Sequence, residues 1–531
     1  MNKLLLSIGL LLSLGIVVAD EYVVTHTNDP IPQSCTANNC SLREAIIAAN
    51  NNPGEDIVLL QNENYRLFLN GIDDDSQAGD LDITDDLIIM LSPDSEFETF
   101  GIESAVNDRV LDVHPGVSFT MHNGHIKGGD TTSLTASENV GGGLRAREAD
   151  IYLIDSTFAF NNARTGGGIY IDQGSANLYS TFIAYNIATE VGGGLNVSEG
   201  LLHVENSIFQ FNQADWGAGL YAGYIPNIIN KDTIQIKDSQ FLGNQANYGG
   251  AICTWGNFGT TMGSILLENT QFIANVASEQ GGAIYHYDAL MTIRKSNFQN
   301  NFAQSKNQLA SNYGGAIYSG NPNSPSGYAE LHVLDSLFNA NGADSSGGGL
   351  YANDLVQITN TTFSGNTADT NAAIQMNQGD LSLKHITMIN NEAINDVDLA
   401  VGITVTGSIQ NSIINGRCNV VSFAGFESLG GNIESPADTC ELGGGSQDLS
   451  NIHPRFLYLD SNLADNGGPT QTHAIRNSSS RAIGNAIAIN EVTTDQRLKL
   501  RDSMPDSGAV EAYETDFTLI FKNGFEENAD E

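Results

Sequence analysis

The sequence predicts an all-β fold, a right-handed parallel β-helix with one short capping helix at its N-terminal end. From about residue 141 a phrase of ~25 residues recurs, which opens on a pair of glycines and closes on an aromatic residue followed by asparagine. Within each phrase apolar and polar residues alternate, which is the period of a β-strand. Repeats made of short strands and glycine corners stack as coils of a solenoid, and parallel crossovers are right-handed in nearly all proteins.

The composition suits a folded and strongly acidic rod. The chain has 531 residues, of which 40% are hydrophobic, so it can bury a core and is not a disordered protein. Its formal net charge of -40 repels phosphate backbones and anionic lipids, so we expect no nucleic-acid partner. The same charge disfavours a polyanionic substrate unless calcium bridges the like charges.

Residues 1–19 have the pattern of a signal peptide. Lys3 gives a charged start, an apolar stretch runs from Leu4 to Val18, and the small residue Ala19 precedes two acidic residues. A Sec signal cleaved after Ala19 explains this order better than a membrane anchor, because an anchor needs ~20 apolar residues and a basic flank. We therefore expect an exported protein, extracellular or associated with the outer membrane at the cell surface, with no transmembrane segment in its mature chain.

Residues 20–55 are expected to cap the first coil. In CTANNCSLREAI, Ser41 and Glu44 form a capping box that starts a helix. An open solenoid exposes the apolar interior and the strand edges of its first coil, and a short amphipathic helix across that end would cover both. The stripe of apolar residues expected to face the coil consists of Leu42, Ala45, Ile46 and Ala49.

The cysteines are interpreted as disulfides because the chain is exported. The natural local pairs are Cys35 with Cys40 and Cys418 with Cys440. Cys253 is left over, and no catalytic histidine or metal-ligand pattern lies near it in the sequence, so we interpret it as a small structural residue.

Residues 56–416 are expected to form the β-helix, with about three strands in each coil. The repeated aromatic residue should stack inside the rod and the repeated asparagine should bond along it. Asn186 comes one residue later than its counterparts, which suggests an insertion in that coil. The glycine openings begin at Gly141, Gly166, Gly192, Gly217, Gly249, Gly281, Gly314 and Gly347. The repeated aromatic positions are Phe158, Phe182, Phe209, Phe241, Phe272, Phe298, Phe338 and Phe363.

Three further segments follow the coils. Residues 417–450 are glycine-rich and contain the second cysteine pair, residues 451–515 have the composition of a separate terminal module, and residues 516–531 are an acidic tail. The repeat pattern is absent from all three.

Three sets of motifs resemble known bacterial families. CSLREAI, GDLDIT and DRVLDVHPG resemble CSLREA-type exported β-helix proteins, and LADNGGPTQTHAI, TTDQR and DSGAVE resemble the choice-of-anchor Q module. The GGA(I/L) and FxxN repeats are similar to those of chlamydial polymorphic outer membrane proteins, which are surface adhesins. These resemblances imply an exported β-helix protein at a bacterial surface. The module departs from its family at residues 480–484, which read Ser-Arg-Ala-Ile-Gly.

The best binding candidate lies on the first strand of each coil. Tyr285, Tyr318 and Tyr351 occupy the same outward position on three consecutive coils, and Trp255 lies in an insertion that follows another such strand. We predict that they form an exposed ladder at ~4.8 Å spacing that binds a glycan or a surface protein. In the alternative interpretation the tyrosines only pack on one another and protect the sheet.

A carbohydrate-active enzyme is the second hypothesis, because pectin-lyase-like β-helices also carry polysaccharide lyases and glycoside hydrolases. Arg294 and Lys295 are the most plausible basic pair for a lyase. Asp155, Asp238 and Asp335 share one repeated position, but asparagine occupies it in other coils, which indicates a turn and not a carboxylate reaction. We therefore predict no catalytic residue and a non-enzymatic adhesin or scaffold.

One acidic loop is dense enough to consider a metal. GIDDDSQAGDLD contains Asp73, Asp74, Asp75, Asp80 and Asp82, whose oxygens suit Ca²⁺. The predicted ligands are Asp73, Asp75 and Asp80. The loop lacks the glycine and glutamate of an EF-hand, so the prediction is a calcium site of another kind. A solvated acidic turn is the alternative.

Overall fold

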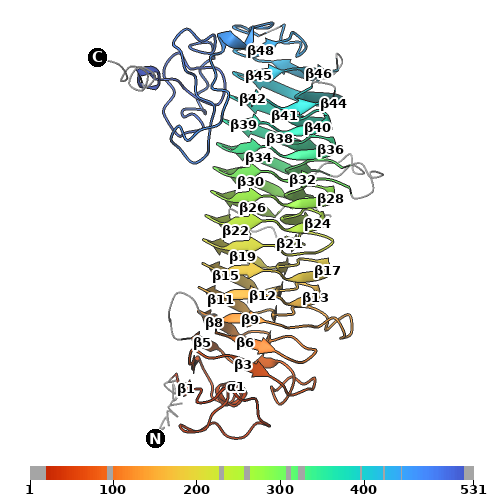
Figure 1. Cartoon of the computed structure of the whole chain (residues 1–531), viewed down its shortest axis with the longest axis vertical. Helices are drawn as coiled ribbons and strands as arrows, with labels where there is room; N and C mark the ends of the chain where they lie inside the picture. Colours follow the sequence, from red (N-terminus) through yellow and green to blue (C-terminus); the bar gives the residue numbers. More distant parts are fainter. Residues whose placement is uncertain are drawn as a thin grey trace, which may run out of the picture.

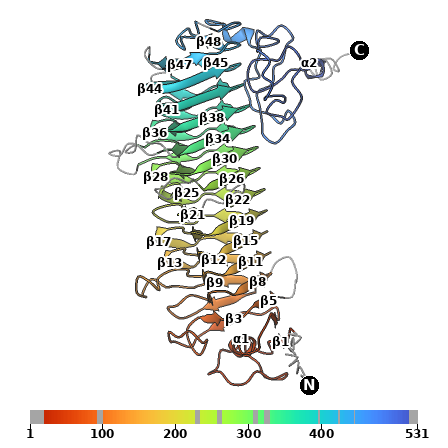
Figure 2. The same ribbon diagram turned by 180° about the vertical axis from the view of Figure 1, so that it is seen from behind.

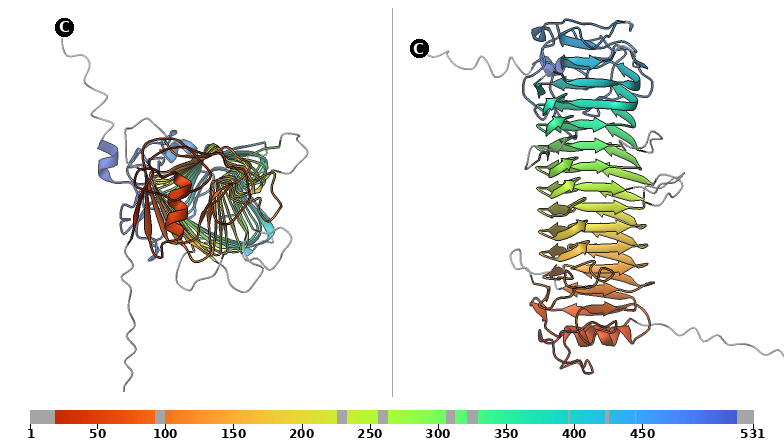
Figure 3. Two further views of the ribbon diagram at one scale, coloured as in Figure 1. Left: turned by 90° about the horizontal axis from the view of Figure 1, so that it is seen from below. Right: turned by 90° about the vertical axis from the view of Figure 1, so that its right-hand side faces the viewer.

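The protein is a long rod of stacked coils (Figure 1). The computed structural model describes residues 19–518 apart from 92–99, 226–232, 256–262, 306–311, 321–328, 395–396, 422–424 and 444. The predicted signal peptide, except its last residue, and most of the acidic tail lie outside the described residues. Residues 256–262, in the predicted insertion that contains Trp255, lie outside them as well. A side view shows the coils stacked directly above one another, which confirms the parallel β-helix (Figure 3).

Most regular coils contain four short strands, one more than the sequence predicts. In the described residues the first and second strands form a 26-stranded parallel sheet, the third strands a 14-stranded sheet, and the fourth strands sheets of six and two. Every strand pairs in parallel with its counterpart one coil away, so a residue's neighbours along the rod lie roughly one repeat away in sequence. Fourteen rungs at ~4.8 Å give a rod roughly 60 Å long before its ends are counted.

The strands fall into four groups. The first strands are β4 (Leu81–Ile83), β7 (Leu111–Val113), β10 (Leu144–Arg147), β14 (Ile169–Asp172), β18 (Leu195–Ser198), β21 (Leu220–Gly223), β25 (Ile252–Trp255), β29 (Ile284–His286), β33 (Ile317–Ser319) and β37 (Leu350–Ala352). The second strands are β1 (Glu21–Val23), β2 (Asp56–Leu60), β5 (Leu87–Leu91), β8 (Ser118–His122), β11 (Asp150–Ile154), β15 (Ser175–Tyr179), β19 (Leu201–Glu205), β22 (Ile234–Lys237), β26 (Ser264–Glu268), β30 (Leu290–Arg294), β34 (Glu330–Leu334) and β38 (Leu355–Thr359). The third strands are β3 (Tyr65–Leu67), β6 (Ile102–Ser104), β9 (His125–Lys127), β12 (Thr157–Ala159), β16 (Phe182–Ala184), β20 (Ile208–Gln210), β23 (Gln240–Leu242), β27 (Gln271–Ile273), β31 (Asn297–Gln299), β35 (Leu337–Asn339), β39 (Thr362–Ser364), β42 (Thr387–Ile389), β45 (Ile413–Gly416) and β48 (Ile433–Pro436). The fourth strands are β13 (Asn162–Thr165), β17 (Ile187–Val191), β24 (Gln245–Tyr248), β28 (Val276–Gln280), β32 (Phe302–Ala303), β36 (Gly342–Ser346), β40 (Thr367–Thr370) and β43 (Glu392–Ala393).

The last coils join the first and second strands. The long strands β41 (Ile374–Lys384) and β44 (Leu399–Gln410) each span both positions. The ladder continues past residue 416, because β46 (Cys418–Val420) and β47 (Gly425–Ser428) pair with β44, and β48 pairs with β45. The predicted disulfide between Cys418 and Cys440 is formed beside this coil.

A phenylalanine stack fills the centre of the rod, as predicted, with one exception. Consecutive rings from Phe209 to Phe363 lie parallel with centroids 4.6–5.2 Å apart. In the coil before Phe209 the inward position belongs to Ile183, which pairs in register with Phe158, whereas Phe182 points outward. The prediction for Phe182 was therefore wrong. That coil has no insertion, because its aromatic residue simply stands one position earlier than the others.

The repeated asparagines form a continuous ladder, as predicted. Each side-chain amide nitrogen donates to the Oδ1 of the next asparagine at 2.9–3.1 Å, and the same Oδ1 accepts the backbone N–H of the first. Asn186 takes its place in this ladder between its neighbours. The members are Asn161, Asn186, Asn212, Asn244, Asn275, Asn301, Asn341, Asn366 and Asn391.

The corner between the second and third strands explains the Asp/Asn position. Asp155, Asp238 and Asp335 have φ of 49°, 49° and 50°, in the left-handed region. Short polar side chains adopt this conformation more readily than others. Burial raises the pKa of Asp335 to about 6, while its hydrogen bond from Asn360 acts in the opposite direction. The predicted turn role is confirmed.

Helix α1 (Leu42–Asn50) lies across the N-terminal end of the rod (Figure 3, left). Ser41 is its N-cap, and the predicted capping box with Glu44 is formed. The predicted apolar stripe is buried, and the Cys35–Cys40 disulfide precedes the helix. Arg43, which the sequence did not single out, is fully buried, pairs with Asp29 at 2.8 Å and donates to three carbonyl oxygens of residues 76–80.

We expect the free energy of unfolding of the Ile46→Asp variant to be roughly 3 kcal/mol lower than that of the wild type. The substitution buries an unpaired carboxylate and uncovers the first coil. The exposed strand edge should also cause self-association. Thermal melting and light scattering after size exclusion measure both effects. Ile47→Asp is the matched control, since Ile47 is only half-buried on the same helix. Equal stability and a monomeric state for Ile46→Asp would contradict the role of the helix as a lid.

The C-terminal module folds back along the last coils instead of extending the rod (Figures 1 and 2). It begins with the short 3-10 helix η1 (Pro454–Phe456) and ends at α2 (Glu514–Thr518). Gln496 donates to the carbonyl oxygen of Ser336 at 3.0 Å and accepts from Thr362 at 2.6 Å. Asn411 and the backbone of Ile487 exchange two hydrogen bonds. The module therefore covers the outer face of the third sheet over these coils.

Candidate functional site

One outward position of the first strands runs the length of the rod. At its N-terminal end it carries charged residues, and further along it carries aromatic ones, so two candidate sites share one row. Pairing between strands fixes the order as Asp82, Asp112, Arg145, Tyr170, Asn196, Tyr221, Cys253, Tyr285, Tyr318, Tyr351 and Gln375.

The charged end is a buried ion-pair network. Carboxylate oxygens of Asp80, Asp82 and Asp112 lie within 4.8 Å of one another, and all three side chains are buried. Arg109 donates to Asp80 at 2.9 Å, and Arg145 pairs with both oxygens of Asp112. Burial raises the pKa of Asp80 well above its usual value, and Asp108 adds to this effect while Arg109 opposes it. The network holds negative charge in the first coils and ties consecutive strands together.

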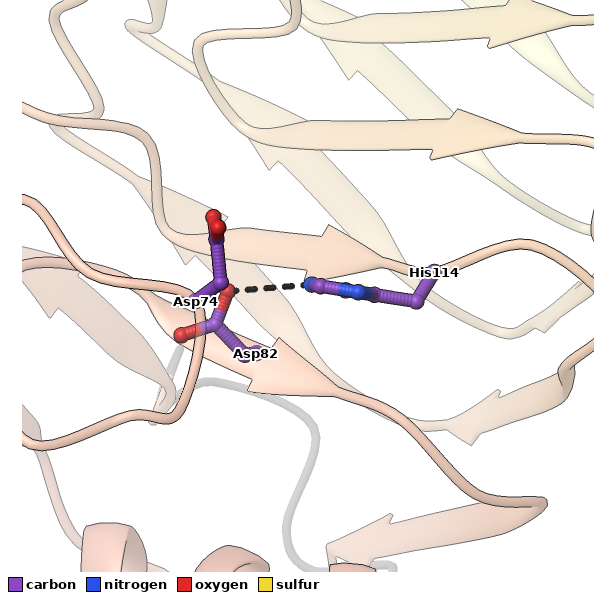
Figure 4. Close-up of side chains that lie close together, drawn as sticks. All are labelled: Asp74, Asp82 and His114. Atoms are coloured by element: carbon purple, nitrogen blue, oxygen red, sulfur yellow. Dashed lines mark hydrogen bonds and ion pairs between the residues drawn. The ribbon is translucent and has the colours of Figure 1, made fainter.

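His114 lies at the open side of this network, beside Asp82 and Asp74 (Figure 4). Its Nε2 is 3.3 Å from Asp82 Oδ1, and this hydrogen bond raises the pKa of His114 above its usual value despite partial burial. The carboxylate of Asp82 therefore favours the protonated form of His114.

The predicted calcium residues do not come together. Asp73 remains at the surface, where its Oδ1 accepts the backbone N–H of Asp75 and of Gln77, as in a turn. Of the acidic loop, Asp80 and Asp82 join the buried cluster, and Asp74 lies beside Asp82 and His114. The carboxylates of Asp80 and Asp112 already have cationic partners, since guanidinium groups contact their oxygens.

The tyrosine ladder is present, but it is not exposed. Tyr285 and Tyr318 stack with centroids 5.1 Å apart and planes 5° apart, and Tyr351 continues the stack at 5.3 Å. Tyr285 is only 6% exposed and Tyr318 only 1%. The expectation of an exposed ladder was wrong for these two residues, because other aromatic side chains cover them. Burial correspondingly raises their pKa values.

The covering residues are partly exposed and form the outer layer of an aromatic cluster. Trp216 stacks on Tyr248 at 4.1 Å and meets the ring of Tyr285 edge-on at 5.8 Å. Trp255 stacks on Tyr287 at 4.5 Å. The partly exposed members are Trp216, Tyr221, Tyr248, Trp255, Tyr313 and Tyr351.

The sequence contained a signal for this layer that we did not use. Trp216, Tyr248 and Tyr313 each stand immediately before the glycine that opens a coil. That position bridges consecutive coils and lies beside the first strand, so an aromatic side chain there folds over the outward row. An aromatic residue immediately before GG or GA therefore predicts a member of this outer layer.

Cys253 and the basic pair Arg294 and Lys295 have structural roles. Cys253 is fully buried within the aromatic cluster, and burial raises the pKa of its thiol, so it is not a nucleophile. Arg294 and Lys295 both pair with Glu268, at 2.8 and 3.1 Å. Neither is poised as a free base.

One family model matches two segments of the repeats. Residues 238–254 and 295–320 match the model of the Chlamydia polymorphic membrane protein repeat. A similar solved structure is the catalytic domain of a GH87 alpha-1,3-glucanase in complex with tetrasaccharides, with 9% identity and a TM-score of 0.35 over 76% of this chain and 69% of that chain. No curated protein matches. Within the described residues, no helix is both long and apolar enough to cross a membrane.

Proposed function

We propose that the chain is an exported, non-enzymatic β-helix protein of the cell surface that binds a partner through the aromatic cluster on its first strands. The observation that carries this proposal is the partly exposed outer layer around Trp216 and Trp255, supported from beneath by buried, stacked tyrosines. Tryptophan and tyrosine held rigidly in this way supply large contact area at little cost in side-chain entropy.

Several sequence features support the location. The signal peptide pattern, the CSLREA-type N-terminus and the choice-of-anchor Q motifs all favour export and surface association. The match to a polymorphic membrane protein repeat favours it as well. The partner is a glycan or a protein of another surface.

The proposal predicts that the double variant Trp216→Ala/Trp255→Ala binds at least 10-fold more weakly than the wild type, because the rings that contact the partner are lost. Binding is measured on arrays of glycans and of extracellular-matrix proteins. The buried tyrosines are unsuitable targets, since truncating them opens cavities. Tyr152→Ala is the control, because Tyr152 is a 37% exposed aromatic residue on the second strands. Binding that survives in the double variant, or is absent from the wild type, would refute the proposal.

A carbohydrate-active enzyme, either polysaccharide lyase or glycoside hydrolase, is the second candidate. The carboxylates of Asp80, Asp82 and Asp112 favour it by their proximity and by the raised pKa of Asp80. Their arginine partners and burial favour the structural role. Release of reducing or unsaturated sugar ends from a polysaccharide panel by the purified protein would establish the enzyme and replace our first proposal.

A further inference from the structure

A second uncharged surface lies on the third strands of this acidic protein. The outward residues of the third strands β12, β16, β20, β23, β27 and β31 are all uncharged, although the chain has a net charge of -40. On the second strands of the neighbouring coils, by contrast, one outward row reads Glu205, Lys237, Glu268 and Arg294. The solvent-accessible outward residues of the uncharged stripe are Thr157, Phe182, Ile208, Gln210, Gln240, Leu242, Gln271, Ile273, Asn297 and Gln299, whereas Ala159 and Ala184 are buried.

Aromatic rings border one end of this uncharged stripe. Phe160, Tyr185 and Phe211 follow the third strands of three consecutive coils, and 60%, 44% and 41% of their surfaces are exposed. The rings of Phe160 and Tyr185 are parallel with centroids 5.1 Å apart, and Phe211 continues the row at 5.3 Å. Phe182 and Ile208 lie on the adjoining strands and add apolar surface.

The backbone at these aromatic residues is unfavourable for bulky side chains. Their φ values are 58°, 56° and 53°, in the left-handed region that bulky residues avoid. In later coils the same corner is occupied by glycine, alanine or asparagine. The fold does not need a strained aromatic residue at this corner, since the later coils form it with smaller ones. Backbone strain of this kind, at three solvent-facing rings, is typical of a functional surface. The later residues are Gly243, Ala274, Asn300, Ala340, Gly365 and Asn390.

Amide side chains border the other end. No hydrogen bond to another described residue engages the side-chain amides of Gln210, Gln240, Gln271 or Gln299, and the Oδ1 of Asn297 is buried without a partner. Amides both donate and accept hydrogen bonds. At this end the stripe runs into a crevice of about 140 Å³ beneath the C-terminal module. The crevice is lined by Asn269, Thr270, Gln271, Lys295 and Asn297 of the coils and by Pro469, Thr470 and Gln471 of the module.

We infer that the uncharged stripe, with its aromatic border, binds a neutral polysaccharide laid along the rod. The apolar C–H faces of sugar rings pack on aromatic side chains, and their hydroxyl groups match amides that donate and accept. The stripe spans five rung intervals, roughly 24 Å, which fits an extended chain several sugars long. The net charge disfavours both a polyanion and a second copy of this chain as the ligand. This face is distinct from the aromatic cluster, so the inference does not rest on the proposed function.

The test uses native affinity electrophoresis of the full mature chain in gels containing mixed-linkage β-glucan, xylan, galactomannan, dextran or starch, with alginate as an anionic polymer. We expect at least one neutral polymer to retard the wild type. The double variant Phe160→Asn/Tyr185→Asn should bind that polymer at least 10-fold more weakly. Asparagine already occupies this corner at Asn300 and Asn390, so the variant should melt at or above the wild-type temperature. Gln271→Glu should weaken binding similarly, because it places a charge in the stripe.

Matched controls separate this surface from others. Ala274→Asn changes the same corner outside the aromatic rings, Gln357→Glu places the same charge on the second strands, and Tyr152→Ala removes an exposed ring from the second strands. All three should bind the neutral polymer as the wild type does. The inference is overturned if no neutral polymer retards the protein, if only alginate does, if the variants of the stripe bind normally, or if only protein ligands are found for this face.

Discussion

The Asn275→Ala variant should lose on the order of 4 kcal/mol in free energy of unfolding. Asn275 Nδ2 donates to the carbonyl oxygen of Phe241 and to Asn301 Oδ1, and its Oδ1 accepts the backbone N–H and the side-chain amide of Asn244. Removing the side chain leaves several of these buried groups without a partner, and each such group costs about 1–3 kcal/mol. Neither water nor a neighbouring side chain can replace them, because Asn275 lies fully inside the rod.

The loss should be local before it is global. Each coil of a solenoid contacts only its neighbours, so the defect divides the ladder into two shorter ones. Urea denaturation monitored by circular dichroism measures the stability, and limited proteolysis locates the opening near the altered coil. Asn247→Ala is the control, since Asn247 is exposed and should change stability by no more than ~0.5 kcal/mol. A variant Asn275→Ala that resists urea like the wild type would show that the ladder contributes little.

Gly282→Ala should destabilise the protein by about 3 kcal/mol or more, or prevent its accumulation as soluble protein. A Cβ atom at this position would lie 2.1 Å from the carbonyl oxygen of Gly315 and 2.6 Å from the backbone of Phe302. These contacts are with backbone of the next coil, which cannot move aside without breaking the rungs around it. The methyl group added by Gly282→Ala would therefore push two coils apart.

The matched control is Gly443→Ala, because no atom lies within 4 Å of a Cβ built there. Melting temperature and soluble yield are compared for the two variants. A melting temperature within 2 °C of the wild type for Gly282→Ala would mean that the coils tolerate greater separation than their close backbone contacts indicate.

The regular coils were predictable because the same constraint is repeated many times. Alternation identified the inward side of the strands, the Asp/Asn interchange identified a turn, and the repeated asparagine identified its ladder. Phe182 was assigned wrongly because it stands four residues before its asparagine instead of three. This spacing looks like the usual inward phenylalanine followed by one inserted residue. Only the pairing of Ile183 with Phe158 distinguishes a shift from an insertion.

The candidate sites were less predictable because they depend on what covers a side chain. The sequence indicates that Tyr285 points out of the rod. In the structure Trp216, which lies two coils earlier, packs edge-on against its ring and covers it. The acidic loop shows the same limit. Its residue Asp80 meets Asp112 and Arg109 only because the irregular first coils align in one register. The composition revealed the negative charge of the loop, but only the structure shows which arginines pair with its carboxylates.

The Asn ladder has a consequence for how such a protein changes length. Because each asparagine makes the same bonds to its successor, removing residues 249–280 would join Tyr248 to Gly281 and let Asn244 face Asn301 in the same geometry. A whole coil is thus an exchangeable unit, and duplication or loss of one alters the reach of the rod by ~4.8 Å without redesigning either end. The length of the rod can therefore change by whole coils.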